Sequence, residues 1–456
     1  MNVAAVLMAV IALALSVTLP GPAGTVGAPG AQGAAGAPGA DGAQGLPGAA
    51  GPAGTDGADG LACWDRNGNG IGDPAEDVNA DLSVDVLDCT GPPGLGVGRA
   101  GFSRTILDSA GDVGQHTSVT IGADGLGLIS YFDATNTDLK VAHCADVACT
   151  AATNATLDST GDVGHSTSLT IGADGLGLIS YNDNANGDLK VAHCSNIACT
   201  AAILSTLDST GSVGYHTSVT IGADGLGLIS YFDATNADLK VAHCADVACT
   251  AATSATLDSA GIAGEYTSVT IGADGLGLIS YYDGTNADLR VAHCADLACT
   301  TATLSTLDST AGVGAYTSLT IGSDGLGLIS YWHGTNADLK VAHCADLACT
   351  AASTATLNSG GSVGTYTSVT IGADGLGLIS YNDLSNGDLK VAHCSNIACT
   401  VATTATVDST GDVGYYTSVT IGADGLGLIT YYDNTNFVLK VAHLSNVFGL
   451  PYVRYR

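Results

Sequence analysis

A fifty-residue unit repeated seven times constrains this chain more than any other feature of its sequence. One copy begins Thr117-Ser-Val-Thr-Ile-Gly-Ala-Asp-Gly-Leu-Gly-Leu-Ile-Ser-Tyr131 and continues, after a polar loop, as Asp138-Leu-Lys-Val-Ala-His-Cys144. The unit returns without insertion or deletion, so its histidine recurs every fifty residues. These histidines are His143, His193, His243, His293, His343, His393 and His443. A fixed period of this length indicates a repeat architecture in which neighbouring units bury one another's apolar faces.

Each unit contains four segments typical of β-strands. Thr117–Ala123 alternates polar or small residues with apolar ones and ends at Asp124-Gly125, a strong signal for a two-residue hairpin. Leu126–Asp133, Leu139–Cys144 and Thr150–Ser159 follow, separated by Gly, Asp and Asn. Four antiparallel strands in each of seven units predict an all-β protein, a seven-bladed β-propeller. The alternative is a solenoid, which needs atypical capping repeats. The end units here look like the middle ones, and this favours the propeller.

The segment before the first unit predicts how the ring closes. Thr105–Ser109 matches Thr156–Ser159, the end of a fourth strand. We expect this segment to complete the last blade, because closure leaves no strand edge unpaired. The tail Tyr452–Arg456 competes for the same place.

The residues before the repeats predict four further segments. Residues 1–20 are almost wholly apolar and indicate a signal peptide or an uncleaved N-terminal anchor. Residues 21–62 form a collagen-like stalk, since Gly recurs at every third position from Gly21 to Gly60 and only Gly fits the axis of a triple helix. The stalk predicts a homotrimer through residues 21–60, and a flexible linker is the alternative. Calcium-binding loops at 63–90 and a linker at 91–103 precede the propeller, which spans 104–456.

Two loops within 63–90 carry oxygen ligands at the alternate spacing that curls a chain around Ca²⁺. In the first loop Gly70 allows the sharp turn, and in the second Leu82 replaces that glycine. An acidic solvated loop is the alternative to a metal site. The predicted ligands are Asp65, Asn67, Asn69, Ile71, Asp73 and Glu76 in the first loop, and Asp77, Asn79, Asp81, Ser83, Asp85 and Asp88 in the second.

These segments resemble known families. The calcium loops, which have no helix between them, are similar to thrombospondin type 3 and dockerin-like repeats. The order of stalk, calcium loop and propeller resembles bacterial secreted collagen-like proteins. The stretch Ile121–Tyr131 is similar to the neuraminidase-type (Asp-box) repeat, although the Ser-x-Asp-x-Gly-x-Thr-Trp form is not present.

The fourteen cysteines and the net charge of −31 indicate the environment of the protein. Even numbers of cysteines at fixed spacing predict disulfides and an extracellular, secreted or cell-surface location. The acidic charge disfavours nucleic acid, whose phosphates would be repelled, and leaves the N-terminus, if uncleaved, as the contact with a membrane. The predicted pairs are Cys63–Cys89, Cys144–Cys149, Cys194–Cys199, Cys244–Cys249, Cys294–Cys299, Cys344–Cys349 and Cys394–Cys399.

Positions that differ between units are the candidates for ligand binding, because residues repeated in every unit, such as Asn136, Lys140 and His143, suit a hydrogen-bond network of the blade. We expect the variable positions in two loops that meet around the central channel, although the variation could also be drift. The first set is His116, Ser166, His216, Tyr266, Tyr316, Tyr366 and Tyr416; the second is Phe132, Asn182, Phe232, Tyr282, Trp332, Asn382 and Tyr432. The predicted ligand-binding residues are Trp332, His333, Tyr366, Tyr416, Tyr282 and Tyr432.

Three classes of function remain open. The first is a non-enzymatic adhesion or binding protein that recognises an extracellular glycan or protein ligand. The second is an enzyme of the sialidase or glycosidase kind, which needs clustered arginines or paired acids; the repeats contain one arginine, Arg290, and one glutamate, Glu265. The third is a structural component of a cell surface.

Overall fold

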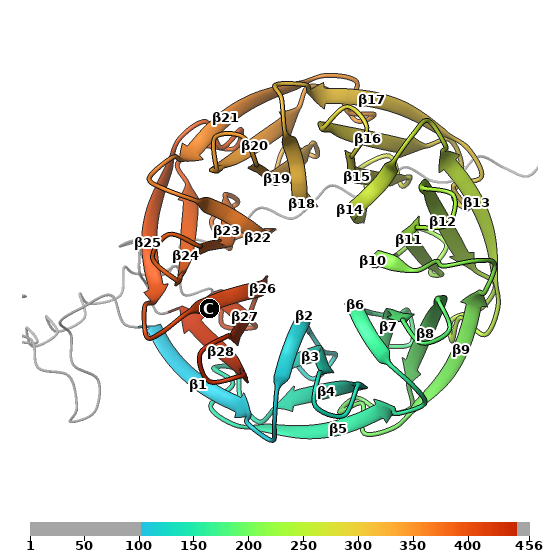
Figure 1. The fold of residues 1–456 in the computed structure, drawn as a ribbon, viewed down its shortest axis with the longest axis vertical. Coiled ribbons are helices and arrows are strands. Elements are labelled where there is room, and N and C mark those ends of the chain that lie inside the picture. Colours follow the sequence, from blue (N-terminus) through green and yellow to red (C-terminus); the bar gives the residue numbers. More distant parts are fainter. Residues whose placement is uncertain (1–101, 445–456) are drawn as a thin grey trace, which may run out of the picture. The chain divides into compact units, whose positions relative to one another are not determined.

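A computed structural model describes residues 102–444, which form seven four-stranded antiparallel sheets arranged as a ring around a central channel (Figure 1). The predicted seven-bladed propeller is therefore confirmed. Each blade runs from an innermost strand at the channel, through two middle strands, to an outermost strand at the rim. No helix capable of crossing a membrane occurs within residues 102–444.

The strands recur at nearly constant bounds from blade to blade. The innermost strands are β2 (Val113–Ile121), β6 (Val163–Ile171), β10 (Tyr215–Ile221), β14 (Ala263–Ile271), β18 (Val313–Ile321), β22 (Val363–Ile371) and β26 (Val413–Ile421). The second strands are β3 (Gly127–Asp133), β7 (Gly177–Asp183), β11 (Gly227–Asp233), β15 (Gly277–Asp283), β19 (Gly327–His333), β23 (Gly377–Asp383) and β27 (Gly427–Asp433). The third strands are β4 (Asp138–Cys144), β8 (Asp188–Cys194), β12 (Asp238–Cys244), β16 (Asp288–Cys294), β20 (Asp338–Cys344), β24 (Asp388–Cys394) and β28 (Val438–Leu444). The outermost strands are β5 (Ala152–Asp158), β9 (Ala202–Asp208), β13 (Ala252–Asp258), β17 (Ala302–Asp308), β21 (Ala352–Asn358), β25 (Ala402–Asp408) and β1 (Phe102–Asp108).

The ring closes as the sequence predicted. β1, the first described strand, pairs antiparallel with β28, the third strand of the last blade, and the two lie side by side in Figure 1. Thr105 lies opposite Val441 and Ile106 opposite Lys440. The last blade is thereby completed by the N-terminal end of the described chain, so a segment more than 300 residues away in sequence supplies its outer strand.

Apolar side chains fill the space between neighbouring blades. All seven residues of β3 are buried, and one core cluster joins Leu128 and Val141 of the first blade to Ile179 and Tyr181 of the second. Close packing explains a glycine that opens every second strand. A Cβ added at Gly127 would lie 2.8 Å from the Cys144 sulfur and 2.9 Å from the Leu428 side chain of the adjacent blade, closer than real Cβ contacts allow.

A buried polar contact between blades accompanies this packing. Asp108, at the end of β1, accepts hydrogen bonds from the Tyr131 hydroxyl at 2.7 Å and from Lys140 Nζ at 2.6 Å, both in the next blade. The equivalent Tyr–Asp contact recurs at five further junctions, and Lys or Arg accompanies it at each of them. At the remaining junction Asn358 replaces the aspartate and donates to the Tyr381 hydroxyl. Of the three repeated residues expected to form a network, Lys140 takes part in this contact, whereas Asn136 bonds to Asp133 and His143 to Asp124 within the blade.

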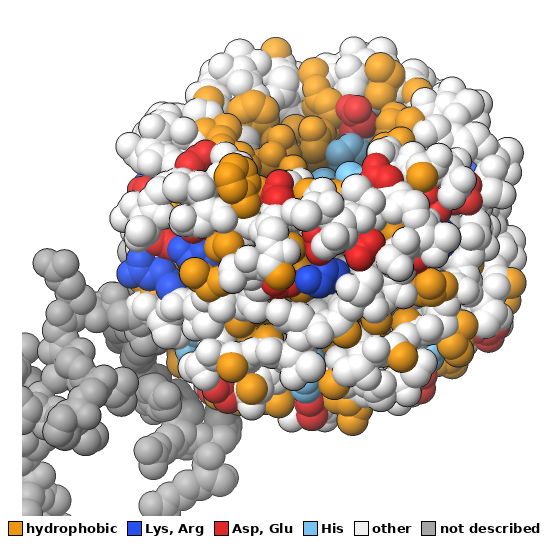
Figure 2. Space-filling view, turned by 60° about the horizontal axis from the view of Figure 1, so that its bottom comes forward, with side chains coloured by type: hydrophobic (Ala, Val, Ile, Leu, Met, Phe, Trp, Pro, Cys, Tyr) orange, Lys and Arg blue, Asp and Glu red, His pale blue; other side chains and the backbone are white. Residues whose placement is uncertain are grey.

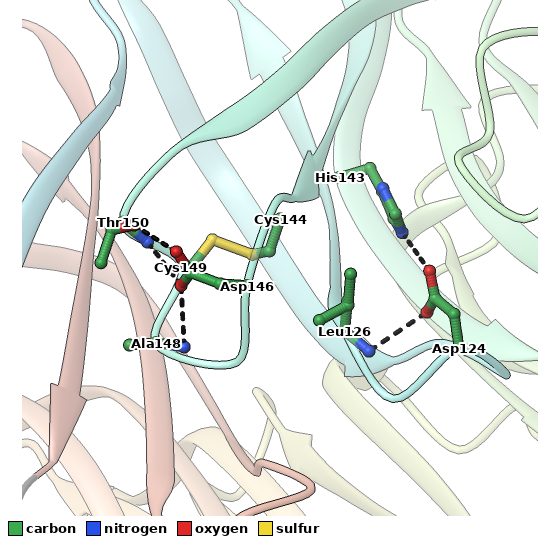
Figure 3. The surroundings of a disulfide bond; sticks show 8 residues. All are labelled: Asp124, Leu126, His143, Cys144, Asp146, Ala148, Cys149 and Thr150. Atoms are coloured by element: carbon green, nitrogen blue, oxygen red, sulfur yellow. Dashed lines mark hydrogen bonds and ion pairs between the residues drawn. A yellow bond between two sulfur atoms is a disulfide. The ribbon is translucent and has the colours of Figure 1, made fainter.

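The six disulfides predicted within the repeats are confirmed. Each closes the short loop between the third and outermost strands, as Cys144–Cys149 does in Figure 3. Asp146 accepts hydrogen bonds from the Ala148 and Thr150 amides of the same loop, and the nearby hairpin turn is held by a contact of 2.8 Å between His143 Nε2 and Asp124 Oδ2. The predicted Cys63–Cys89 pair lies outside the described residues.

Candidate functional site

One residue per blade projects into the mouth of the central channel from an irregularity in the innermost strand. In β2 the pairing with β3 shifts register between Gln115 and Ser118, and His116, within this bulge, has a φ of 52°. This left-handed backbone costs a residue other than glycine roughly 1–2 kcal/mol, and bulges of this kind redirect a side chain. We call the seven equivalent residues the channel collar. They are His116, Ser166, His216, Tyr266, Tyr316, Tyr366 and Tyr416, and each has a φ between 51° and 54° except Tyr416, at 50°.

The rings of the channel collar contact one another around most of the circumference. Centroids of neighbouring rings are 4.4 Å apart for His216 and Tyr266, 4.6 Å for Tyr266 and Tyr316, and 4.7 Å for Tyr316 and Tyr366. The series continues through Tyr416, which lies 4.7 Å from Tyr366 and 4.4 Å from His116. The aromatic series is interrupted at Ser166, so six of the seven positions form one aromatic band.

The channel collar encloses a cavity of about 190 Å³. Its remaining lining consists of seven threonines, each directly after a collar residue: Thr117, Thr167, Thr217, Thr267, Thr317, Thr367 and Thr417. These hydroxyls already bond to the neighbouring blade, as Thr167 Oγ1 does to Ser130 Oγ at 2.7 Å. The threonines therefore brace the channel, and the collar residues complete the lining of the cavity.

Positive charge is kept away from this mouth. The described residues contain eight Lys and Arg side chains, and each of them pairs with an aspartate of the blades. Figure 2 shows the consequence on one face: Lys and Arg lie on the outer wall, whereas the hollow is lined by apolar and His side chains with carboxylates around it.

Three carboxylates lie beside the mouth, and each belongs to the residue directly before an innermost strand. Asp112 accepts hydrogen bonds from the Tyr432 hydroxyl at 2.7 Å and from Gln115. Asp412 accepts from Tyr415 and Asn434. These four donors carry no charge, so they orient the two carboxylates without neutralising them.

The third carboxylate, Asp162, contacts His165 Nε2 at 2.8 Å and accepts from Asn184 at 2.7 Å. Burial would raise the pKa of Asp162, but these two contacts outweigh it and lower that pKa. Glu265 lies on the other side of the mouth, and burial raises its pKa.

The two histidines of the channel collar are held neutral. Burial lowers the pKa of His116 to about 3, with help from the neighbouring His165 and His216. Burial also lowers the pKa of His216 to about 4. At neutral pH the collar therefore presents uncharged aromatic rings.

Of the six predicted ligand-binding residues, all lie in strands and not in loops, and two line the cavity. Tyr366 and Tyr416 belong to the channel collar. Trp332 lies within β19, opposite Ala315 and with its ring 6.0 Å from Tyr316, so the expectation of a solvent-facing loop is wrong. The reason is that the bulge lengthens the innermost strand and pairs it with the end of the second strand. His333, at 7% exposure, is buried.

Tyr282 and Tyr432 occupy the position of Trp332 in their own blades. Tyr282 lies 6.4 Å from Tyr266, and Tyr432, which is buried, lies 6.3 Å from Tyr416. These second-set rings therefore lie beside collar rings, but no second-set residue lines the cavity, and Asn182 and Asn382 are fully buried. The carboxylates Asp112, Asp162 and Asp412 were not singled out from the sequence, where the signal is an Asp-Val-Gly phrase present in only three of the seven units.

The predicted calcium ligands, Asp65 to Asp88, lie outside the described residues. Within residues 102–444, no group of three or more His, Cys, Asp or Glu side chains is arranged to hold a metal ion.

Comparison with known proteins confirms the collagen-like segment and the fold. Residues 18–65 match the collagen triple helix repeat family (20 copies). No curated protein matches the chain in sequence. A protein of unknown function from Dyadobacter fermentans has a similar structure, with a TM-score of 0.50 at 13% identity, covering 75% of this chain and 97% of that one.

Two sialidase structures are also similar at lower scores. The NanB sialidase from Streptococcus pneumoniae has a TM-score of 0.43 at 10% identity, covering 75% of this chain and 70% of its own. The intramolecular trans-sialidase from Ruminococcus gnavus has a TM-score of 0.43 at 11% identity, covering 75% and 97%. At such identities the likeness concerns the fold alone. The collagen-like repeats and the six disulfides indicate an extracellular protein.

Proposed function

We propose that this protein is a non-enzymatic binding or adhesion protein, secreted or held at the cell surface, whose propeller recognises a carbohydrate or glycoprotein at the channel collar. One observation carries the proposal. The repeated blades differ at the collar, the seven collar residues lie around one cavity, and Trp332 lies beside the collar residue Tyr316. The blades also differ in their exposed outermost strands, as between Asn154 and Leu204. What supports recognition is therefore that the collar differences converge on one concave surface.

The chemistry of the surface supports a sugar-bearing ligand. Tyr and Trp rings offer rigid apolar faces with a polar edge, and such rings are enriched where proteins bind ligands. Trp332 supplies a further ring beside Tyr316, and its buried indole N–H has no hydrogen-bond partner among residues 102–444. The cavity of about 190 Å³ is smaller than typical ligand pockets of ~300–1,000 Å³. We therefore propose that one terminal group enters it while the rest of the ligand stays outside.

Trimerisation through residues 21–60 would place three heads on one stalk. A single shallow site binds weakly, but linked sites raise the apparent affinity without any new contact. The collagen family match over residues 18–65 supports this part of the proposal.

Calcium at residues 63–90 belongs to the same proposal. The ligand spacing of Asp65 to Glu76 supports one ion, and Asp77 to Asp88 a second, weaker one. Metal would order a segment that has little apolar surface of its own.

Two alternatives remain as competing functions. An enzyme of the sialidase kind would need arginines free to hold a carboxylate, and within the described residues both arginines are engaged by blade aspartates: Arg104 by Asp408 at 3.0 Å and Arg290 by Asp258 at 2.5 Å. A purely structural surface component would need no concave site at all.

A glycan array probed with the full chain tests the proposal. We expect binding to a restricted set of glycans, and loss of that binding in Trp332→Ala and Tyr366→Ala. The matched control is Asp324→Asn in the invariant hairpin turn, where Asp324 contacts only His343 and the Leu326 amide among the recorded hydrogen bonds of residues 102–444. Equal glycan binding by wild type and both aromatic variants, with the fold intact by circular dichroism, would remove the channel collar as the site.

A further inference from the structure

The channel collar has the features of a receptor for a positively charged organic group. We propose that the group entering the cavity is an ammonium group, quaternary or protonated, carried on the ligand. This inference rests on the proposed function, because it takes the collar as the ligand site and adds the chemistry of the group bound there.

Aromatic faces supply the first part of the argument. A cation near the face of a Tyr or Trp ring is attracted by the negative charge of that face, and more strongly when the cation is desolvated. Four tyrosines in succession, from Tyr266 to Tyr416, line one side of the cavity with neighbouring centroids 4.6–4.7 Å apart. A group that enters the cavity therefore meets several rings at once.

The distribution of charge supplies the second part. Every Lys and Arg of the described residues is paired with an aspartate in the blades. Asp112 and Asp412, beside the mouth, have only neutral hydrogen-bond donors among the side chains recorded around them in residues 102–444. The mouth thus combines aromatic rings with unneutralised negative charge, which attracts cations and repels carboxylates and phosphates.

Size supplies the third part. The cavity of about 190 Å³ is small for a ligand site, since typical ligand pockets have ~300–1,000 Å³. This size suits a small group such as trimethylammonium or aminomethyl, with the rest of a larger ligand outside the cavity. The invariant threonines below are bonded to the next blade, so they leave the rings as the main contact of the bound group.

The test compares probes that differ only in charge. Choline is titrated into the full chain by isothermal calorimetry or by following Tyr resonances, and 3,3-dimethylbutan-1-ol, its uncharged carbon analogue, is titrated in parallel. Glucosamine against glucose and N-acetylglucosamine makes the same comparison for a protonated amine and identifies which ammonium source is preferred. We expect at least one charged probe to bind tenfold or more tightly than its neutral partner, and the difference to shrink as NaCl is raised.

Two substitutions of Tyr316 distinguish binding to an aromatic ring from simple apolar packing. Tyr316→Phe keeps the π-face and should retain choline or glucosamine binding, whereas Tyr316→Leu should weaken it about tenfold, which corresponds to ~1.4 kcal/mol. Asp112→Asn keeps an acceptor for Tyr432 and should weaken the charged probe but leave the neutral one unchanged. Asp324→Asn removes the same charge at the opposite hairpin turns and serves as the control.

Two outcomes would overturn the inference. Equal binding of the charged and neutral probes, or equal loss in Tyr316→Phe and Tyr316→Leu, would refute recognition of a cation. If neutral glycans from the array still required the collar in that case, the proposed function would stand without the ammonium group. If the charged probes bound while no glycan did, the ammonium site would stand and the proposal of a carbohydrate ligand would fail.

Discussion

Replacing Asp308 by Asn should destabilise the propeller more than the same change at an equivalent junction. Asp308 accepts from the Tyr331 hydroxyl at 2.7 Å, from Thr310, and from Lys340 in the next blade. Burial would raise the pKa of Asp308, but these contacts outweigh it and lower that pKa to about 2 from an ordinary value of 3.8. A shift of this size corresponds to about 2 kcal/mol favouring the charged form.

The expected difference between the two variants depends on how many carboxylates lie near the neighbouring lysine. Within the described residues, Asp308 is the carboxylate recorded within 4.0 Å of Lys340, because His333 replaces the aspartate found at that position in the other blades. In the second blade Lys190 has both Asp158 and Asp183, at 2.5 Å and 3.8 Å. Asp308→Asn would leave a nearly buried ammonium without a partner, whereas Asp158→Asn would leave Lys190 near Asp183. We therefore expect a loss of about 2 kcal/mol or more for Asp308→Asn and a smaller loss for Asp158→Asn.

Urea unfolding followed by circular dichroism measures both losses. The folded pKa of Asp308 is below its unfolded value, so its contribution is fully present above pH 3.8 and is lost as the pH falls through about 2. The difference between wild type and Asp308→Asn should therefore be constant from pH 7 to pH 5 and shrink between pH 4 and pH 2. Equal losses for the two variants, or a difference that persists undiminished at pH 2, would refute the reasoning.

Four further predictions concern other parts of the chain. Deleting residues 102–108 should leave β28 with an unpaired edge and cause aggregation, measurable by light scattering. Replacing Cys344 and Cys349 together by Ser should cost about 2 kcal/mol in urea unfolding, the closure entropy of a six-residue loop; an unchanged midpoint would contradict this. EDTA should increase protease cleavage within residues 63–90, and unchanged cleavage would exclude calcium there. Deleting residues 21–60 should lower binding to an immobilised glycan by roughly 10²-fold or more through lost avidity, but leave the intrinsic affinity of one head unchanged.

The architecture of this protein could be predicted from its sequence. A constant period, a hairpin signal at Asp124-Gly125 and four strand-like segments in each unit predict seven blades, because local pattern decides strands and tight turns. The closing strand was also predictable, since Thr105–Ser109 repeats the end of a fourth strand and a ring leaves one place unfilled. The disulfides of the repeats followed from their spacing of five residues.

The direction of the variable side chains could be established only from the three-dimensional fold. From the sequence, His116 and its equivalents were expected in a loop. In the structure they lie within the innermost strand, where their left-handed backbone conformation directs the side chains toward the channel. Trp332 read as a loop residue, yet strand pairing places it opposite Ala315 and beside Tyr316. No residue type marks these bulges in the sequence, because His, Ser and Tyr all adopt the same φ at this position.

The hydrogen-bond partners of the polar residues that recur in the units likewise depend on the three-dimensional structure. Lys140 and Tyr131 belong to one unit, but the aspartate that joins them, Asp108, comes from the preceding outer strand. The sequence indicates that each unit repeats these residues. It cannot indicate which blade they bond to, because that depends on how one sheet packs against the next, and the same packing brings seven single residues together as a collar around one cavity.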